Sequence, residues 1–274
     1  TLLNKASICT IDSFCLDVVK NNFFEINISQ NFRIGDTTEI EILKQDVLED
    51  LFEEKYEKED KDFEKLINTY TSYKDDTPLK ELILKIYTYI QSNPFPEKWL
   101  EEKIEMFNLE DNLEKDFSQT IWGKLLLKQV EEILQDSETK LEAEKNNLAK
   151  YPELIKYFQI INDDIEQLEM LKINLDSWDK AYTIAQNIKF KTWVSDKKIT
   201  LEAKDIAKAT RDTVKESIKK VTEKILIFDS KEANEDINDM YKVLIKLKNI
   251  ILEFGEKFAK RKKEKNIVDF SDIE

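Results

Sequence analysis

The chain has 274 residues, of which 36% are charged, and its formal net charge is −14. It contains no histidine, three glycines and two cysteines, which excludes His-based catalysis, a glycine-rich triphosphate loop and a zinc site built from several thiols. So few glycines and prolines favour long helices, and without an apolar run of membrane-spanning length or a signal-peptide pattern we expect a soluble, cytoplasmic protein.

The N-terminal stretch combines a short apolar run with a helix start. Residues 6–11, Ala-Ser-Ile-Cys-Thr-Ile, predict a short strand. Asp12 or Ser13 can cap the helix that follows, and Phe14 opens the apolar face of that helix.

Three further helix starts are predicted before residue 100. Asp36-Thr-Thr-Glu39 resembles a capping box, Thr77-Pro78 places an N-cap before a proline, and Pro96 opens a helix after the break at Asn93-Pro-Phe-Pro96. The apolar positions after the first two starts recur at helical spacing and are Ile40, Leu43, Val47, Leu48, Leu51 and Phe52, then Leu79, Leu82, Ile83, Ile86, Tyr87 and Ile90.

The remaining two thirds of the chain predict long helices with short joints. One helix is expected over residues 112–150, ended by Tyr151-Pro152, and the last two over 200–228 and 235–263. Leu154, Phe158, Ile161, Ile165 and Leu168 follow each other at spacings of four and three, which is typical of an antiparallel coiled-coil-like pair. The predicted fold is therefore all-α, an elongated bundle of long helices that allows a short N-terminal strand.

Charge is distributed unevenly along the chain. Residues 37–64 hold twelve acids against four lysines, a balance of −8. Residues 185–228 hold eleven bases against six acids, a balance of +5, and residues 256–265 hold six against two, a balance of +4. The net charge argues against a protein that coats DNA over its whole surface, but its distribution is uneven.

One helical face in the first basic stretch is a candidate for DNA binding. Its members follow spacings of four, three, four and four, and they are Lys204, Lys208, Arg211, Lys215 and Lys219. Charges on one rigid face suit sequence-independent contact with phosphates. The alternative is a lysine-rich surface whose stems run along a core stripe.

A few other side chains invite an interpretation. Arg33 suits a structural ion pair better than catalysis. Cys9 and Cys15 are expected to be small apolar side chains without a disulfide. Trp193 lies between two lysines and could stack on a base, contact a protein or cover a helix end. The other tryptophans singled out, Trp99, Trp122 and Trp178, are expected to pack in the core.

The two ends of the chain carry motifs of a known helicase family. Ala6-Ser-Ile-Cys-Thr-Ile-Asp-Ser-Phe-Cys15 resembles the Thr-x-His-Ser/Gly-Phe-Cys motif of superfamily 1 DNA helicases of the UvrD/Rep/RecB type. Asn266-Ile-Val-Asp-Phe-Ser-Asp-Ile-Glu274 resembles the Leu/Val-Asp-Phe-x-Asp-Leu stretch that precedes the magnesium-holding acidic box in that family. The resemblance implies that the polypeptide between these landmarks is subdomain 1B, an α-helical insertion in the first motor domain.

Two internal segments narrow the resemblance to AddA-type helicase-nucleases, which form AddAB complexes. Asn31-Phe-Arg-Ile-Gly-Asp-Thr-Thr-Glu39 is similar to their Phe-Arg-Ile-x-Asp-x-x-Glu segment. Ile86-Tyr-Thr-Tyr-Ile-Gln-Ser-Asn-Pro-Phe-Pro-Glu-Lys-Trp-Leu100 is similar to their Tyr-x-Phe-x-x-Ser-x-Pro-x-Pro-x-x-Trp-Leu stretch, which other UvrD-type helicases lack.

The resemblance implies both DNA-binding positions and a longer parent enzyme. Thr10, Ser13 and Phe14 match a motif that lies near single-stranded DNA, whereas Asp12 replaces the usual histidine. The parent is expected to unwind DNA with ATP and Mg²⁺, to degrade it with a nuclease domain in double-strand-break repair, and to bind an AddB-type partner. The present segment is expected to hold no cofactor and to be inactive alone.

The same resemblance predicts how the chain divides. Residues 1–35 would form the edge of motor domain 1A, residues 36–265 the 1B insertion, and residues 266–274 a return segment toward the ATPase box. The alternative is an acidic helical scaffold that binds proteins through coiled-coil faces without any role in nucleic-acid binding. The terminal motifs favour the helicase segment, because a scaffold does not need them.

Overall fold

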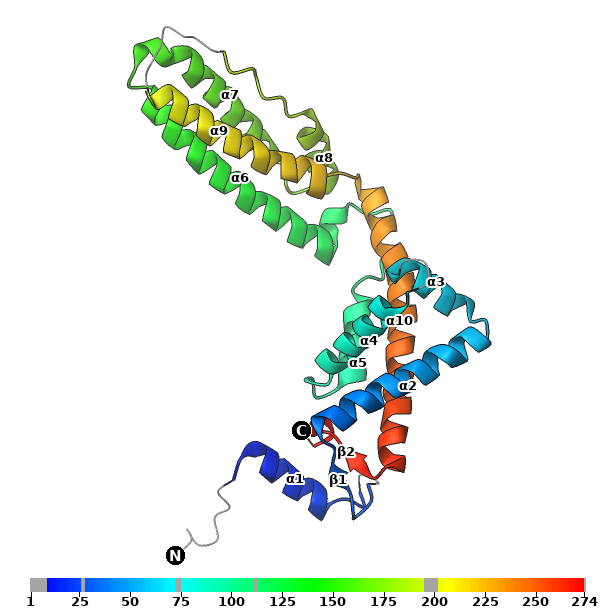
Figure 1. The fold of residues 1–274 in the computed structure, drawn as a ribbon. Coiled ribbons are helices and arrows are strands. Elements are labelled where there is room, and N and C mark those ends of the chain that lie inside the picture. The colour runs from blue at the N-terminus through cyan, green and yellow to red at the C-terminus, as the bar shows by residue number, and fades with distance from the viewer. Residues whose placement is uncertain (1–8, 26–27, 72–74, 111–112, 195–201, 274) are drawn as a thin grey trace, which may run out of the picture. The chain divides into compact units, whose positions relative to one another are not determined.

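The fold was analysed in a computed structural model that describes residues 9–25, 28–71, 75–110, 113–194 and 202–273. The chain divides into two compact units, residues 1–107 with 240–274, and residues 108–239 (Figure 1). The boundary on the C-terminal side falls inside one long helix, α10 (Ser230–Glu264). No helix among the described residues is long and apolar enough to cross a bilayer.

The first unit is built from short and medium helices around one side of α10. In chain order its elements are α1 (Ile11–Asn21), β1 (Arg33–Ile34), α2 (Thr37–Glu57), α3 (Lys61–Tyr70), α4 (Thr77–Ile90), α5 (Pro96–Glu105), the C-terminal part of α10, β2 (Ile267–Val268) and the 3-10 turn η6 (Phe270–Asp272). Its core joins the apolar faces of α2, α4 and α5 to Phe254 and Phe258 of α10. Tyr87 packs edge-on against Phe254, with ring centroids 5.0 Å apart.

A small parallel ladder closes the first unit. β1 pairs with β2 in the register Arg33 to Ile267 and Ile34 to Val268. A separate apolar cluster of Val19, Val268 and Ile273 joins α1 to this ladder. Two residues per strand bury little, so the ladder depends on the packing of Ile267 in the core of the first unit and of Val268 against α1.

The second unit is a helical bundle in which α6 packs against both α7 and α9 (Figure 1). Its elements are η3 (Phe117–Gln119), α6 (Ile121–Leu148), η4 (Pro152–Leu154), α7 (Ile155–Lys172), α8 (Trp178–Asn187), α9 (Glu202–Lys220), the π-helical turn η5 (Val221–Ile225) and the start of α10. Lys172 near the end of α7 bonds to Gln135 and Glu138 of α6 at 2.6 Å each. Because η4 joins the end of α6 to the start of α7, these two helices are antiparallel, as their apolar spacing predicts.

The structure confirms the all-α class and much of the predicted periodicity. All six apolar positions predicted for the helix after Asp36 are buried, and the Asp36 side chain caps that helix by accepting from the Glu39 amide at 2.9 Å. Pro96 is the first residue of α5, as predicted. Arg33 forms a two-pronged ion pair with Glu39, with both distances 2.7 Å.

The N-terminal predictions need correction. The cap of α1 is Thr10 rather than Asp12 or Ser13, since its hydroxyl accepts from the Ser13 amide at 3.3 Å. Ile11 is therefore helical and not part of a strand. The predicted strand otherwise covers residues 6–10, of which 6–8 lie outside the described residues and the other two are not extended into a sheet.

Four other helix boundaries also differ from the prediction. α6 begins at Ile121, capped by Thr120, because the preceding chain turns at η3 instead of continuing a helix from residue 112. α9 ends at Lys220, where a π-helical turn follows, and α10 starts at Ser230 rather than at residue 235. The N-cap of α4 is Asp76 and not Thr77.

Candidate nucleic-acid interface

Arg211, one of the predicted DNA-binding residues, is buried in the second unit. Only 1% of it is exposed, and its partner Asp164 on α7 is fully buried. Arg211 donates to both carboxylate oxygens of Asp164, at 2.5 and 3.2 Å, and to the Lys191 carbonyl at 2.7 Å. The prediction that Arg211 faces outward with the lysines is therefore wrong: its guanidinium satisfies a carboxylate inside the bundle.

In the buried Arg211–Asp164 pair, each charged side chain is stabilised by the other in place of water. Burial raises the pKa of the Asp164 carboxyl, and the hydrogen bonds and charge of the guanidinium oppose that rise. The centroids of the Phe190 and Trp193 rings each lie 5.7 Å from the Arg211 Cζ atom. A buried ion pair contributes little net stability but is costly to break on one side only. Arg211 thus acts as a core residue that fixes how α9 meets α7.

The extended segment of residues 188–194, here called the strap, is held across this pair. Gln167 donates to the Lys189 carbonyl at 3.2 Å and accepts from the Lys189 amide at 2.8 Å. Tyr157 donates to the Val194 carbonyl at 2.8 Å, and its ring lies 4.7 Å from that of Trp193. Trp193 is therefore partly buried against the bundle, beside Tyr157 and Arg211.

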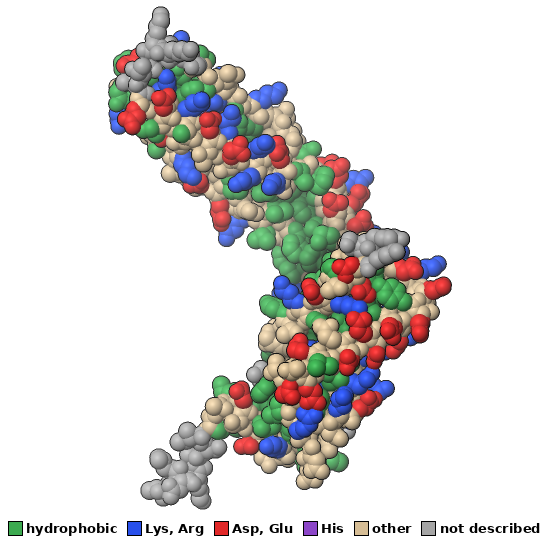
Figure 2. Space-filling view, viewed as in Figure 1, with side chains coloured by type: hydrophobic (Ala, Val, Ile, Leu, Met, Phe, Trp, Pro, Cys, Tyr) green, Lys and Arg blue, Asp and Glu red, His purple; other side chains and the backbone are tan. Residues whose placement is uncertain are grey.

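The remaining predicted residues of α9 lie beside its buried face. Lys208 and Lys219 are exposed and Lys215 is half-buried; we call these three the lysine flank. Among the described residues, their ammonium groups form no ion pair. Lys204 differs, because its ammonium lies 3.9 Å from the carboxylate of Asp205. In Figure 2, Lys and Arg side chains are scattered over the visible face of this unit.

The basic end of α10, by contrast, is neutralised by α2. Lys257 pairs with Glu54 at 2.7 Å and Arg261 with Asp50 at 2.6 Å. Lys55 of α2 pairs in turn with Glu253 of α10 at 2.8 Å. Acidic side chains gather over the part of the first unit where α2 lies (Figure 2). The acidic and basic stretches of the sequence thus face each other, which leaves this basic stretch less suited to DNA than the lysine flank.

Lys262 fixes the C-terminal segment to α10. Its exposure is 4%, and its ammonium bonds to Asp269 at 3.1 Å and to both oxygens of Asp272 at 2.6 Å. Asp269 in turn caps η6 by accepting from the Asp272 amide at 3.0 Å. Burial and the neighbouring carboxylate raise the pKa of Asp272, against the attraction of Lys262. The acidic motif at this end of the chain is therefore held by a buried cation.

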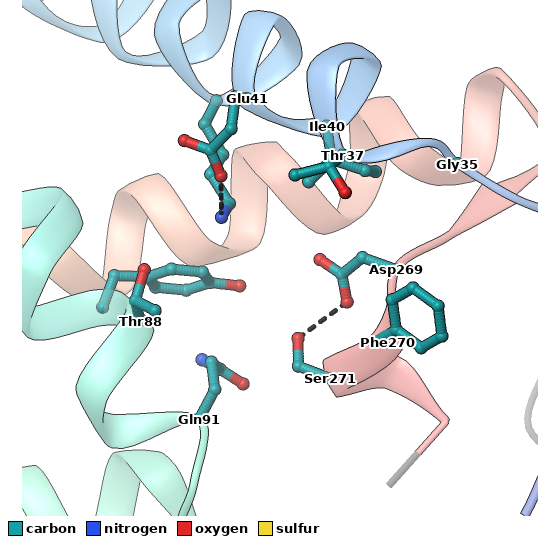
Figure 3. A pocket seen from close by; sticks show the side chains of 11 residues that line it. Gly35, Thr37, Ile40, Glu41, Thr88, Gln91, Asp269, Phe270 and Ser271 are labelled. Atoms are coloured by element: carbon teal, nitrogen blue, oxygen red, sulfur yellow. Dashed lines mark hydrogen bonds and ion pairs between the residues drawn. The ribbon is translucent and has the colours of Figure 1, made fainter. Parts of the chain in front are cut away.

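A cavity of about 220 Å³ lies beside this motif (Figure 3). Asp269 and Ser271, joined by a 2.7 Å hydrogen bond, form one side of it, and Thr88 and Gln91 face them from the end of α4. Burial raises the pKa of the Tyr87 hydroxyl, which also lines the cavity. The described residues offer no cluster of three or more His, Cys, Asp or Glu that could hold a metal ion.

The other predicted DNA-binding residues lie on α1. Thr10 and Ser13 are exposed, and their hydroxyls bond to each other at 3.0 Å. Phe14 is 59% exposed and Ile11 78% exposed, so α1 presents an apolar face that the described residues do not cover. These three predicted residues lie in the first unit and the lysine flank in the second, so no single described unit brings the predicted set together.

Sequence reasoning missed Asp164 and Lys262, although a signal for each was present. Asp164 falls among Ile161, Ile165 and Leu168, in the register of the apolar seam of α7. A charged residue in an apolar register predicts a buried partner. The same rule applies to Lys262, one turn beyond Phe258. Identifying the partner required the fold, because Asp164 and Arg211 are 47 residues apart.

Comparison with known proteins relates the chain to one group. No family model matches it. Over its full length it is 36% identical to the AddA subunit of the ATP-dependent helicase/nuclease of Acetivibrio thermocellus, 35% to that of Clostridioides difficile and 36% to that of Clostridium kluyveri. The chain spans 22% of the length of each of these relatives. Over its full length the chain is therefore similar to AddA subunits of ATP-dependent helicase/nucleases, and it matches a segment that makes up about a fifth of those relatives.

Proposed function

We propose that this chain is the DNA-guiding 1B insertion of an AddA-type helicase-nuclease that acts in double-strand-break repair. The full-length similarity to helicase/nuclease proteins carries the proposal, together with the motif resemblance at both ends. In this proposal the longer protein uses ATP and Mg²⁺, works in the cytoplasm and binds an AddB-type partner. The relatives do not favour the alternative of a free-standing protein-binding scaffold.

We propose further that residues 1–35 form the edge of motor domain 1A, that residues 36–265 form the 1B insertion, and that residues 266–274 are a return segment toward the ATPase box. Support comes from the small cluster of Val19, Val268 and Ile273, which joins α1 to the two-residue ladder. A parallel ladder this short is normally part of a larger sheet. The exposed Phe14 and Ile11 on α1 suit burial against such a domain.

The proposed DNA-binding residues within the insertion are Lys204 and the three residues of the lysine flank. Among the described residues, Lys208, Lys215 and Lys219 have no carboxylate partner, in a chain that has 57 acidic residues against 43 basic ones. Unpaired cations on one helix flank cost little in water and remain available for sequence-independent contact with phosphates. Thr10, Ser13 and Phe14 remain proposed DNA contacts through the motor-domain motif alone.

Salt-dependent DNA binding tests this proposal. Changing Lys208, Lys215 and Lys219 to Ala should weaken binding of a duplex and a single strand, and should reduce the slope of log affinity against log salt by roughly two to three. The matched control changes Lys124, Lys140 and Lys180 to Ala, which removes the same charge elsewhere in the unit. If both variants lose the same DNA affinity, the effect is due to net charge alone. If neither variant loses affinity, the proposal is contradicted.

We also propose that the segment has no ATPase or nuclease activity of its own. The sequence has no G-x-x-x-x-G-K-[ST] loop to hold a triphosphate. DNA-stimulated ATP turnover that co-purifies with the 274-residue chain would contradict this.

A further inference from the structure

A groove of about 380 Å³ runs beside the lysine flank in the second unit. One wall consists of the end of α8 and the strap, and the other of α9 and the π-helical turn η5. The volume lies within the range of small-ligand sites. The lining residues that matter for its chemistry are Gln186, Phe190, Lys215, Glu216, Lys219 and Glu223.

The π-helical turn in this wall is itself an unusual feature. Such turns are rare, disturb the regular helical hydrogen bonds, and are frequently found at functional sites. Here Gln186 compensates, because its amide nitrogen donates to the Thr222 carbonyl at 3.2 Å and to the Leu226 carbonyl at 2.7 Å. The Gln186 amide is thereby held rigidly at the edge of the groove with its oxygen still able to accept.

Phe190 provides an aromatic surface in the groove. The ring is half-buried and is anchored by the strap, whose neighbouring residues are bonded to Gln167 and Arg211. The Lys215 ammonium lies over the ring, 5.9 Å from its centroid, and the Arg211 Cζ atom lies 5.7 Å from the same centroid. A base that stacks on the exposed part of this ring therefore displaces the Lys215 ammonium toward the flanking phosphate. A fixed aromatic ring beside a cation is the arrangement on which single-stranded nucleic-acid-binding proteins stack bases.

The charged side chains around the groove suit two different parts of a nucleotide, its phosphates and its base. Lys215 and Lys219 lie one helical turn apart, at a separation suited to binding neighbouring phosphates. Glu216 and Glu223 would repel phosphate, but carboxylates accept hydrogen bonds from the amino groups of bases. In a duplex both faces of a base are covered by its neighbours, so only an unpaired base can reach a recessed ring.

We propose that this groove binds an unpaired nucleobase of single-stranded DNA, with the base against Phe190 and the flanking phosphates on Lys215 and Lys219. The proposal rests on the DNA-guiding function above and adds to it the form of DNA that is bound. It also predicts a preference for cytosine over thymine, since cytosine offers an amino group to Glu216 or Glu223 where thymine has an acceptor.

Affinity measurements with two probes at low salt test the proposal. Phe190→Leu should weaken binding of a twelve-nucleotide oligo(dC) by about tenfold, the effect of losing one base–aromatic stack. Binding of a closed hairpin duplex should change less than about twofold, because its bases never reach the ring. The matched control is Phe158→Leu, a half-buried phenylalanine that packs against the same core but does not line the groove.

Photo-crosslinking keeps the test valid if Phe190→Leu disturbs folding. An oligo(dC) that carries one 5-iododeoxycytidine should crosslink the unaltered chain at Phe190, as mapped by mass spectrometry. Crosslinks only outside the groove would overturn the proposal, and so would equal weakening of both probes by Phe190→Leu in a folded protein. If the lysine-flank variant loses DNA binding but Phe190→Leu does not, the groove proposal alone fails; if neither loses it, the DNA-guiding function fails too.

Discussion

At the scale of single residues, Arg211 shows how burial reverses an interpretation based on spacing. Helical spacing places it with four lysines, yet it also falls in the register of Ala207, Val214 and Ile218, the buried side of α9. Arg211 lies on the buried side because the carboxylate of Asp164, which is also buried there, requires a cationic partner. The lysines, with no such partner inside, stay at the flank.

Breaking the Arg211–Asp164 pair on one side should therefore destabilise the second unit. Either Arg211→Ala or Asp164→Ala is expected to lower the free energy of unfolding by about 3–5 kcal/mol, because a buried charge loses its partner. The double variant Asp164→Leu with Arg211→Met should recover most of this loss. Urea denaturation measures both effects, and Lys208→Ala serves as the exposed control. Additive losses in the double variant would show that the pair is not what stabilises the contact.

Asp116 gives the second unit a dependence on pH. Burial alone would raise its pKa, but hydrogen bonds from Ser118, Ser177 and the Trp178 amide outweigh burial and lower the pKa to about 2. A carboxyl with a lowered folded-state pKa stabilises the fold above its unfolded pKa of about 4, and the stabilisation disappears as the pH falls toward 2.

Asp116→Asn should remove this dependence. After allowance for partial exposure, the loss of stability at pH 7 should be about 1 kcal/mol. The variant and the unaltered chain should converge in stability between pH 4 and pH 2. Denaturation curves recorded across this range would contradict the assignment if the difference between the two proteins stayed constant.

At the scale of elements, the sequence predicts the periodic apolar positions of a helix but not the ion pairs and hydrogen bonds between residues distant in the chain. The six core positions of α2 follow from spacing, because each apolar side chain has only one direction to the core. The acidic excess of residues 37–64 does not by itself predict a partner. In the fold, α10 lies beside α2 and supplies Lys257 and Arg261 as cationic partners. The start of α6 is not predictable from local sequence for a similar reason. The chain before it turns at η3, where Asp116 forms hydrogen bonds with the start of α8, which is distant in sequence.

Gly123 makes that turn into α6 possible. A Cβ atom at this position would lie 1.9 Å from the Phe117 carbonyl oxygen, which is backbone and cannot move aside cheaply. Gly123→Ala should therefore lower the stability of the second unit by about 1–3 kcal/mol, even though alanine is the better helix former.

The matched control for Gly123→Ala is Gly255→Ala in α10. There a Cβ atom would meet two ring carbons of the Tyr87 side chain, at 3.1 and 3.8 Å, and the gain in helix propensity should offset the tighter contact. Thermal unfolding followed by circular dichroism compares the two variants. Equal melting temperatures would mean that the η3–α6 turn relaxes at little cost.

At the scale of the whole molecule, the two cores are separate in sequence as well as in contacts. The core of the second unit draws its buried residues from Leu109 to Ala233, all within residues 108–239. The core of the first unit uses residues on both sides of that span, from Ile40 to Ile104 and from Leu247 to Ile267. The sequence predicts one helical insertion over residues 36–265, because apolar periodicity does not reveal which helices share a core.

This division predicts that residues 108–239 fold without the rest of the chain. The segment is continuous and holds the Arg211–Asp164 pair, the strap and the groove, and a chain of this length can bury a sufficient core. Purified alone, it should unfold cooperatively and retain the salt-dependent DNA binding that depends on the lysine flank. Residues 1–107 alone should not fold, because Phe254 and Phe258, which complete their core, lie on α10. A non-cooperative 108–239 segment, or a folded 1–107 segment, would show that the division into two units does not describe how the chain is stabilised.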